Sequence, residues 1–515
     1  QNLFIYSSFQ IKEKIESFET HADFILNSVN SSGHLALRYC VLKKRKDVFD
    51  LLVKYGANVN ATDRRGPILF EAAKSTLPGR IEMLRFMLTQ QGINVTVSFH
   101  GSTAKEVAAS HSQRYFLERA EAQDLFDAEK LKQIGGKRLP ELSMALVGQE
   151  YATRLCFELI AVRLMNLELP SPLVLLFAGP PGHGKTELAL AIAKTFDGSS
   201  IKIDGKNHKT VWEMFGSGTG YQGCRNGSAL NNFVVDQASS GKPGVVLLDE
   251  FDHLDDETMK GFFQAFDKGE WTDKRLLSGG NATRVVNCSG IIWLLTTNKF
   301  DQHVEAFAKS NEEMVSSVNS NFDDIRRKIL KVVWPQVKRV FGDALCRRIT
   351  ELVPFFPFSN EEGYVLTELY ADNVRETYKQ PPTERRHLGC VDFNVSPFAL
   401  KEISKAYQWN QREGASAMHR EFDKRVNQEL SKLWLCNELE PAVTYWLNYN
   451  ESDDLWDLCT CPPLEQQEIC FTKGHWSDIL GDEEQKAEYQ QEDADCSYSA
   501  DMEQHDSLPF QDPFA

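Results

Sequence analysis

Four short hydrophobic runs in the middle of the chain have the pattern of strands buried inside a sheet. They are PLVLLFAG (172–179), IKIDG (201–205), GVVLLDE (244–250) and GIIWLLTTN (290–298). Helical patterns such as TELALAIAKTF follow them, with hydrophobic residues recurring every three to four positions. Strands that alternate with helices in this way predict a parallel α/β sheet, here over about residues 133–353.

The stretch that follows this region is helical by pattern. NEEGYVLTELYADNVRETY (360–378) and SAMHREFDKRVNQELSKLWL (416–435) both carry hydrophobic residues at three-to-four spacing. We therefore expect a small helical lid domain over residues 354–440.

The N-terminal region contains an internal repeat. One unit runs from Gly33 to Gly66 and a second from Gly66 to Gly101, and each predicts two helices and then a loop with Gly and Asn. The stretch LLVKYGANVNATDRRG (51–66) resembles the ankyrin repeat, whose period is about 33 residues.

Two or three such units bury little core by themselves. Capping helices are therefore expected over 8–28 and 112–132, which gives an all-α ankyrin-repeat domain over 1–132. Repeat surfaces often bind protein, so an adaptor protein is a candidate partner. A purely structural role for the repeats is the alternative.

The charge of the chain is concentrated at its C-terminal end. The formal net charge is −16, and the residues from Ser477 onward hold twelve Asp and Glu against one Lys. This composition predicts an acidic, disordered tail over 441–515, either simply solvated or attractive to basic partners. The sequence shows no basic surface for nucleic acid.

Other features of the composition concern the membrane and the compartment. No hydrophobic run approaches the ~18–20 residues that span a bilayer, so no membrane insertion is expected. Eleven cysteines without paired spacing fit reduced thiols in an intracellular protein, and Cys459, Cys461 and Cys470 lack a partner pair at zinc spacing. The chain begins with Gln, so the N-terminus is expected to be incomplete; a cytoplasmic location is favoured and a mitochondrial one is the alternative.

The clearest chemical signal is GPPGHGKT, which follows a predicted strand and opens a predicted helix. This is the context of the phosphate-binding loop, whose backbone N–H groups surround phosphates at a helix N-terminus. Lys185 is expected to reach the β and γ phosphates of ATP, and the Thr186 hydroxyl to ligate Mg²⁺. The candidate nucleotide-binding residues here are Gly179, Pro180, Pro181, Gly182, His183, Gly184, Lys185, Thr186 and Glu187.

A second motif, VVLLDE, ends a predicted strand in two carboxylates. Asp249 is expected to hold the Mg²⁺ shell, and Glu250 to polarise an attacking water. Asn298 ends the next predicted strand, where it could orient that water or sense the γ-phosphate. For each position the alternative is an ordinary polar turn at the end of a strand.

Together these motifs resemble the AAA+ superfamily, specifically the Clp/ClpB-type protein-remodelling ATPases, over about residues 140–430. LVGQE looks like the family's box near the adenine, which implies that Val147 and Gly148 contact the base. LCRRITELVPFFPF looks like its arginine-finger segment, with Arg348 at the finger position, and a surface salt bridge of Arg348 is the alternative. A finger acts on a neighbouring subunit, so the resemblance implies a homo-oligomeric ring, by family expectation a hexamer.

The glycine-rich stretch FGSGTGYQGCRNG (215–227) aligns with the aromatic pore loop of the same family. The resemblance implies that Gly220, Tyr221, Gln222 and Gly223 face the central channel and grip substrate polypeptide without reading its sequence. A tyrosine packed on the surface of the domain is the alternative. One ATPase module after ankyrin repeats is similar in layout to the mitochondrial members of the ClpB family in metazoans.

Two features depart from the family pattern. The lid motif normally reads G-A-R, but Ser416 stands where the arginine that contacts the γ-phosphate would be, and Arg412 or Arg420 are possible substitutes. Residues 300–340 are also longer than the pattern requires, with no role assigned.

The resemblance implies an ATP-driven protein unfoldase or disaggregase that uses ATP and Mg²⁺ to thread unfolded or aggregated proteins through a ring pore. An ATPase that feeds a protease is one alternative, although the I-G-[FL] docking tripeptide is missing from the sequence. A nucleotide-gated ankyrin scaffold with weak or no hydrolysis is another, and Ser416 favours it.

Overall fold

A computed structural model of the 515-residue chain describes residues 8–16, 26–30, 33–90, 92–122, 128–166, 169–196, 199–216, 227–273, 284–316, 322–436, 438–439, 443–450 and 455–460. The chain forms two compact units. The first comprises Gln1–Thr76, Arg80–Val365 and Tyr407–Ala417, and the second comprises Leu77–Gly79, Leu366–Ala406 and Met418–Ala515.

The centre of the first unit is a five-stranded parallel sheet in the order β11-β5-β10-β7-β6. Its strands are β5 (Leu173–Ala178), β6 (Ser200–Asp204), β7 (Gly244–Asp249), β10 (Ile291–Thr297) and β11 (Glu351–Pro354). The predicted parallel α/β sheet is therefore confirmed, and four of its strands are the four hydrophobic runs. The register pairs Thr297 with Ala178 and Leu295 with Leu248, so the carboxyl ends of β5, β7 and β10 lie level at one edge.

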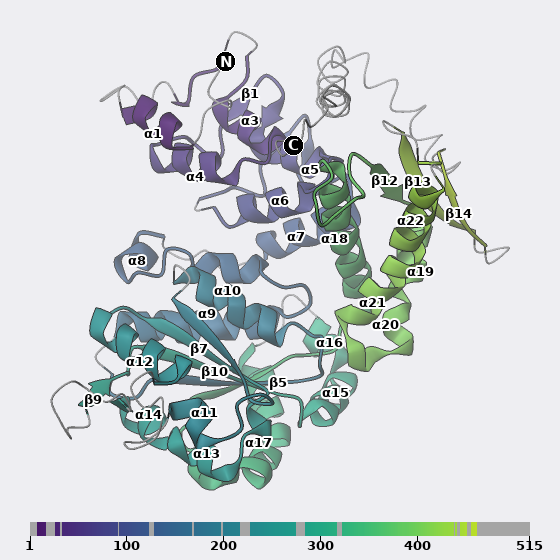
Figure 1. The fold of residues 1–515 in the computed structure, drawn as a ribbon. Helices are drawn as coiled ribbons and strands as arrows, with labels where there is room; N and C mark the ends of the chain where they lie inside the picture. Colours follow the sequence, from purple (N-terminus) through teal and green to yellow (C-terminus); the bar gives the residue numbers. More distant parts are fainter. Residues whose placement is uncertain are drawn as a thin grey trace, which may run out of the picture. The chain divides into compact units, whose positions relative to one another are not determined.

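Helices cover both faces of this sheet. Helices α9 (Glu150–Met165) and α10 (Lys185–Thr195) lie on one face, and α13 (Asp256–Gly261) and α17 (Phe322–Cys346) lie on the other side (Figure 1). The remaining elements of this region are α11 (Val211–Phe215), α12 (Ala229–Ser240), α14 (Phe263–Lys268), α15 (Asp301–Ser310), α16 (Glu312–Ser316) and the hairpin β8 (Glu270–Asp273) and β9 (Arg284–Asn287). Residues 300–340, the long segment, thus form α15, α16 and most of α17.

The N-terminal part of the first unit is built from helix pairs (Figure 1). Two hairpins, each made of two-residue strands, separate these pairs. The helices are α1 (Ser8–Glu16), α3 (Ala36–Leu42), α4 (Lys46–Lys54), α5 (Ile68–Lys74), α6 (Arg80–Leu88), α7 (His111–Glu121) and α8 (Ala128–Gln133). The hairpins are β1 (Thr62–Asp63) with β2 (Gly66–Pro67), and β3 (Ser98–Phe99) with β4 (Ser102–Thr103). The predicted pairing of helices is present; its assignment to the ankyrin family remains a prediction.

An asparagine contact recurs along these repeats. Asn27 Nδ2 donates to the carbonyl of Gly56 at 2.9 Å, and its Oδ1 accepts from Asn58 N at 2.8 Å. Asn60 Nδ2 likewise donates to the carbonyl of Gly92 at 2.6 Å, and its Oδ1 accepts from the next loop at 2.7 Å. The two loops therefore bond their neighbours in the same way, which is the regularity expected of stacked repeats.

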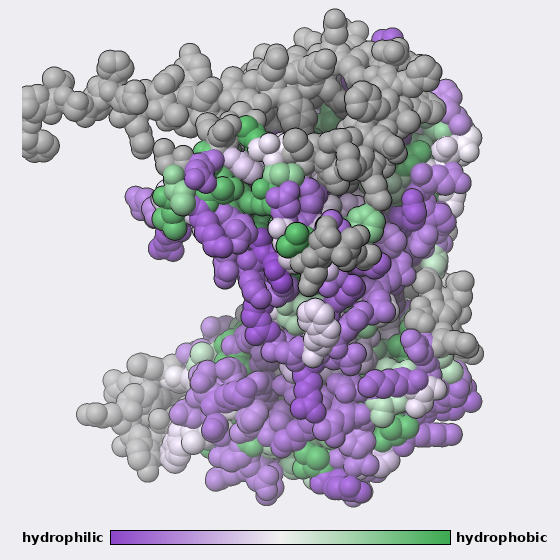
Figure 2. Space-filling view, turned by 90° about the vertical axis from the view of Figure 1, so that its right-hand side faces the viewer, coloured by the Kyte–Doolittle hydropathy of each residue, from purple (hydrophilic) through white to green (hydrophobic). Residues whose placement is uncertain are grey.

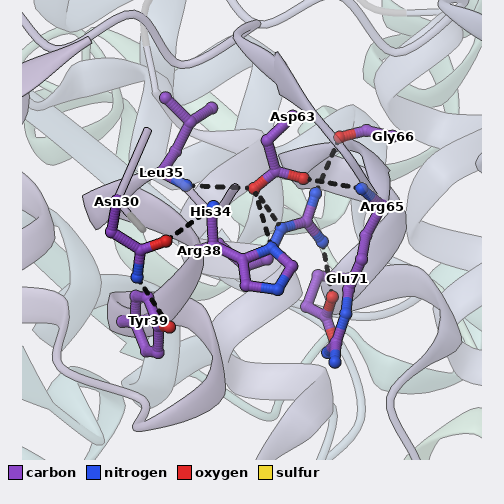
Figure 3. Close-up of polar contacts among 9 residues, drawn as sticks. All are labelled: Asn30, His34, Leu35, Arg38, Tyr39, Asp63, Arg65, Gly66 and Glu71. Carbon is purple, nitrogen blue, oxygen red and sulfur yellow. Dashed lines mark hydrogen bonds and ion pairs between the residues drawn. The ribbon is translucent and has the colours of Figure 1, made fainter. Parts of the chain in front are cut away.

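A buried ionic network ties the first helix pair to the first hairpin (Figure 3). Asp63 accepts hydrogen bonds from Arg38 Nε at 2.7 Å, Leu35 N at 3.1 Å and Arg65 N at 2.9 Å. Arg38 also donates to the Gly66 carbonyl at 2.7 Å. Burial alone would raise the pKa of Asp63, but these hydrogen bonds hold it below its usual range. The charges are satisfied, as buried charges must be.

The second unit combines helices with a three-stranded sheet. In that sheet β12 (Asp392–Val395) runs parallel to β13 (Thr444–Asn450), which pairs antiparallel with β14 (Leu455–Cys459). The helices of residues 360–435, some of which extend into the first unit, are α18 (Asn360–Lys379), α19 (Pro397–Ser404), α20 (Ala406–Trp409), α21 (Ala415–Phe422) and α22 (Gln428–Leu435).

The face shown in Figure 2 is mostly hydrophilic, with hydrophobic residues in small groups.

These strands correct two expectations. Residues 392–395 lie in the segment predicted to be helical, and residues 444–450 and 455–459 lie in the segment predicted to be a disordered tail. The physical reason is aromatic content: Tyr445 and Leu447 are buried on alternate positions, and Tyr449 packs against Trp456 with ring centroids 4.8 Å apart. The acidic residues from Ser477 onward lie outside the described residues.

Candidate nucleotide site

The loop 179–184 connects β5 to α10, so its backbone lies at the carboxyl edge of the sheet. Gly182 has φ +74°, and a Cβ there would lie 2.2 Å from the carbonyl oxygen of Glu413. A side chain would therefore clash with the segment that precedes α21. Helix α10 begins at Lys185, so its N-terminal N–H groups point toward the loop, as in a phosphate-binding site.

The side chain of Lys185 is buried and turned back on the loop. Its Nζ donates to the carbonyl oxygens of Gly179 at 2.6 Å and Pro180 at 2.8 Å. Burial lowers the pKa of Lys185 to about 8. The ammonium group is thus held within the loop where a phosphate would lie.

Thr186 and Asp249 meet below this loop. The Thr186 hydroxyl lies 3.4 Å from Oδ1 of Asp249, although the two residues are on different elements. Burial acts to raise the pKa of Asp249, but hydrogen bonds from Lys202 and Thr296 outweigh it and hold the pKa low. The predicted pair of magnesium ligands is therefore brought together, with the carboxylate ionised.

Two lysines that were not predicted from the sequence form ion pairs with the two carboxylates. Lys202 Nζ lies 2.7 Å from Asp249 Oδ2, and Lys206 Nζ lies 2.5 Å from Glu250 Oε1. Glu250 itself has φ 52°, an uncommon backbone conformation for a residue with a side chain. The strand register places Asp204, the last residue of β6, opposite Asp249. Lys202 and Lys206 flank Asp204 in the sequence, and this position at the end of β6 is the signal that could have identified them.

Thr296, near the end of β10, and Asn298, just after this strand, lie at the same edge of the sheet. Oδ1 of Asn298 is buried and has no hydrogen-bond partner among the described residues, so it can accept a bond from a bound water or ligand. Thr296, which the sequence analysis also missed, donates to Asp249 Oδ1 at 2.6 Å and accepts from Glu250 N at 2.9 Å.

His183 connects the loop to residues 355–358 and to α20. Its Nδ1 lies 2.8 Å from the Pro181 carbonyl and its Nε2 lies 3.0 Å from the Tyr407 hydroxyl, while its ring stacks on Phe358. Burial lowers the pKa of His183 to about 4, so the ring is neutral. The Pro181 carbonyl can only accept, so Nδ1 carries the proton and Tyr407 donates to Nε2.

The segment 146–150 lies beside this loop. Leu146 packs on Gly184, since a Cβ added there would lie 3.1 Å from its Cδ2. Gln149 forms a pair of hydrogen bonds with the backbone of Phe356, at 2.8 Å and 3.1 Å. Val147 is buried, and Gly148 is close enough to Phe358 that a Cβ would lie 3.0 Å from its ring. The predicted adenine box is therefore adjacent to the predicted phosphate loop.

Three further residues of the predicted nucleotide site differ in their exposure to solvent. Pro180 is buried, whereas Pro181 and Glu187 are exposed. Their individual roles stay predictions.

These residues fit Mg²⁺ with ATP. Magnesium prefers oxygen ligands and usually keeps several waters, with one or two carboxylates and substrate phosphates. Thr186 and Asp249 supply a hydroxyl and a carboxylate at one point of the site. Phosphate oxygens and waters would complete the shell.

The structure also describes Arg348, the predicted arginine finger, and Ser416, which replaces the expected lid arginine. Arg348 NH2 pairs with Asp267 Oδ2 at 3.1 Å, and its guanidinium lies 4.4 Å from the Phe263 ring centroid. This is the salt bridge considered as the alternative, and a finger role stays a prediction. Ser416 is exposed; the preceding residue, Ala415, donates from its N–H to the Gly182 carbonyl at 3.1 Å.

Some predicted residues lie outside the described part of the chain. Gly220, Tyr221, Gln222 and Gly223 are among them, as are Cys461 and Cys470.

Residues 175–317, which include most of β5 and all of the phosphate loop, β7 and β10, match the model of the "ATPase family associated with various cellular activities (AAA)". The chain contains an AAA ATPase domain. The family is one of ATPases, which implies nucleotide use, typically with Mg²⁺, so the match supports the prediction of an ATP hydrolase.

Several curated relatives of this chain are named as chaperone proteins. It is 27% identical over 312 residues to the chaperone protein ClpB of Chlamydia pneumoniae, covering 59% of this chain and 33% of that protein. It is 30% identical over 331 residues to the chaperone protein ClpB of Chlamydia trachomatis, covering 63% of this chain and 35% of that protein. The chain thus spans about a third of the length of these relatives.

A solved structure of an S. cerevisiae Hsp104–casein complex in an extended conformation covers 66% of this chain and 54% of that chain, with TM-score 0.49 and 20% identity. Separately, none of the helices in the described ranges is both long and hydrophobic enough to cross a membrane.

Proposed function

We propose that this chain hydrolyses ATP at the carboxyl edge of its parallel sheet. The observation that carries the proposal is the meeting of Thr186 and Asp249, at 3.4 Å, under a glycine-rich loop that opens a helix. The unpartnered Oδ1 of Asn298 at the end of the neighbouring strand supports it, because that oxygen needs a donor from outside the described residues.

Each residue then has a definite task. The N–H groups of the loop and Lys185 bind and orient the phosphates, in place of the carbonyl contacts that Lys185 makes now. Glu250 accepts a proton from the attacking water, and Asn298 orients that water. Bound Mg²⁺ supplies charge neutralisation on the transferring phosphoryl group. Thr186 and Asp249 would hold it.

The finer proposal is that hydrolysis drives protein unfolding or disaggregation. It rests on the similarity to ClpB proteins described as chaperones and on the aromatic glycine-rich stretch around Tyr221. In this proposal the chain forms a homo-oligomeric ring, taken as a hexamer, whose subunits act on one another through Arg348. Unfolded or aggregated polypeptides are the substrates, and the N-terminal repeats recruit them or an adaptor protein.

The second candidate is a nucleotide-gated scaffold with weak or no hydrolysis. Two observations favour it: Ser416 replaces the expected arginine, and Lys202 and Lys206 already neutralise both carboxylates. Steady-state ATP turnover separates the candidates when it is measured with and without unfolded casein. Turnover that rises with casein, and loses that rise in Tyr221→Ala, supports the threading motor. Tight nucleotide binding without turnover supports the scaffold.

A further inference from the structure

Helix α7, which directly follows the helix pairs of the N-terminal region, reaches the segment beside the phosphate loop. The hydroxyl of Tyr115 accepts a hydrogen bond from Gly148 N at 2.9 Å and donates one to Glu150 Oε1 at 3.0 Å. Burial and the charge of Glu150 raise the pKa of Tyr115, so the phenol keeps the proton that it donates. One side chain of α7 thus bonds both the turn and the first residue of α9.

Arg119, one helical turn further along α7, adds a charge contact. It pairs with Glu150, and its NH2 lies 3.5 Å from Glu362 Oε1 in the first turn of α18. Its guanidinium also lies over the Tyr115 ring, 3.4 Å from the centroid. The arginine therefore contacts both carboxylates and offsets part of their mutual repulsion, and it fixes the Tyr115 ring by stacking.

The group that Tyr115 bonds has little freedom of its own. Gly148 has φ +70°, and a Cβ there would lie 2.7 Å from Glu362 Cδ and 3.0 Å from the Phe358 ring. Phe358 in turn stacks on His183 of the phosphate loop, with ring centroids 4.6 Å apart. The position of the Gly148 peptide is therefore set by α7 on one side and by the phosphate loop on the other.

We propose that Tyr115 and Arg119 are positioning residues of the nucleotide site, through which the N-terminal region controls how tightly nucleotide binds. The inference rests on the proposed ATP site and concerns its regulation. Neither residue needs to touch the reacting phosphate. They hold Gly148 and Glu150, which belong to the segment predicted to lie beside the adenine base. Loosening α7 weakens nucleotide binding, while Thr186, Asp249 and Glu250 stay in place for the chemical step.

The test uses the full chain and compares Tyr115→Phe with wild type. The variant keeps the ring but loses both hydrogen bonds, one of them to a carboxylate, so we expect ADP to bind about tenfold more weakly and KM for ATP to rise similarly. The kcat should stay within about twofold, because the chemical groups are untouched. Tyr39→Phe is the matched control: it removes a hydroxyl that bonds Asn30 at 3.0 Å within the same N-terminal region, and it should change neither constant.

A second variant and a second readout make the outcome decisive. Arg119→Met should weaken ADP binding, and Arg119→Lys, which keeps the charge, should restore part of it. Amide hydrogen exchange at Gly148 should be faster in Tyr115→Phe than in wild type. Unchanged ADP affinity, KM and Gly148 exchange in Tyr115→Phe would overturn the inference. A wild-type chain that neither binds ADP nor turns over ATP would instead overturn the proposed function.

Discussion

The hydroxyl of Thr296 donates a 2.6 Å hydrogen bond to Oδ1 of Asp249 at the edge of the sheet. The hydroxyl oxygen of Thr296 also accepts a 2.9 Å bond from the backbone N–H of Glu250. Thr296 is almost completely buried, so neither bond can be replaced freely by water. A single hydroxyl therefore fixes both carboxylate-bearing residues on which the proposed hydrolysis depends.

Replacing Thr296 by valine tests this relationship. The side chain keeps its shape, but Asp249 loses a donor and the Glu250 N–H loses its acceptor. A buried unsatisfied polar group costs about 1–3 kcal/mol, so we expect kcat/KM to fall roughly tenfold or more and the Mg²⁺ requirement to rise. Thr350→Val is the control: it removes a hydroxyl that accepts from Val174 N at 3.0 Å and lies before β11. Equal turnover and equal Mg²⁺ dependence in Thr296→Val and wild type would contradict the role.

Glu362 makes folding stability depend on pH. Burial and the charge of Glu150 raise the pKa of Glu362 from 4.5 to about 7, against the opposing effect of Arg119. Because the folded protein binds this proton more tightly than the unfolded chain, the free energy of unfolding falls as pH rises from 4.5 to about 7 and levels off above that.

Glu362→Gln removes this titration. Urea unfolding at several pH values should show wild type losing stability relative to Glu362→Gln across that window, by at most about 1.4 kcal/mol per pH unit. The groups that act on the pKa of Glu362 include Glu150, Arg119 and Ser359. A difference between the two proteins that stays constant over the window would show that Glu362 titrates normally.

The buried pair of Arg38 and Asp63 supports the N-terminal repeats (Figure 3). Arg38→Met leaves Asp63 as a buried charge without its cation, so the N-terminal region should lose about 3–5 kcal/mol of stability. Arg45→Met breaks an exposed pair with Asp47 and should cost less than about 1 kcal/mol. Hydrogen exchange of residues 33–90 measures both. Equal effects of the two variants would show that burial of the first pair does not matter.

Local features of this structure were predicted from the sequence more completely than features that depend on segments far apart in the sequence. Strands β5, β6, β7 and β10, the loop from Gly179 to Thr186 and the two carboxylates at the end of β7 follow from contiguous patterns, and these were predicted. Thr296, Lys202 and Tyr115 were missed because their roles depend on strand register or on packing between segments far apart in sequence. Strand β11, the hairpin β8–β9 and the strands β13–β14 were missed because short runs with mixed composition do not separate strands from loops.

The measurement that tests the central claim most directly is steady-state ATP turnover of wild type and Glu250→Gln, with ADP binding measured on both. Glu250→Gln keeps the size of the side chain but cannot accept the proton from water. The account predicts Mg²⁺-dependent turnover in wild type, a loss of about 10²-fold or more in Glu250→Gln, and nearly unchanged ADP binding. Turnover that is equal in the two proteins, or absent from wild type despite tight nucleotide binding, would contradict it.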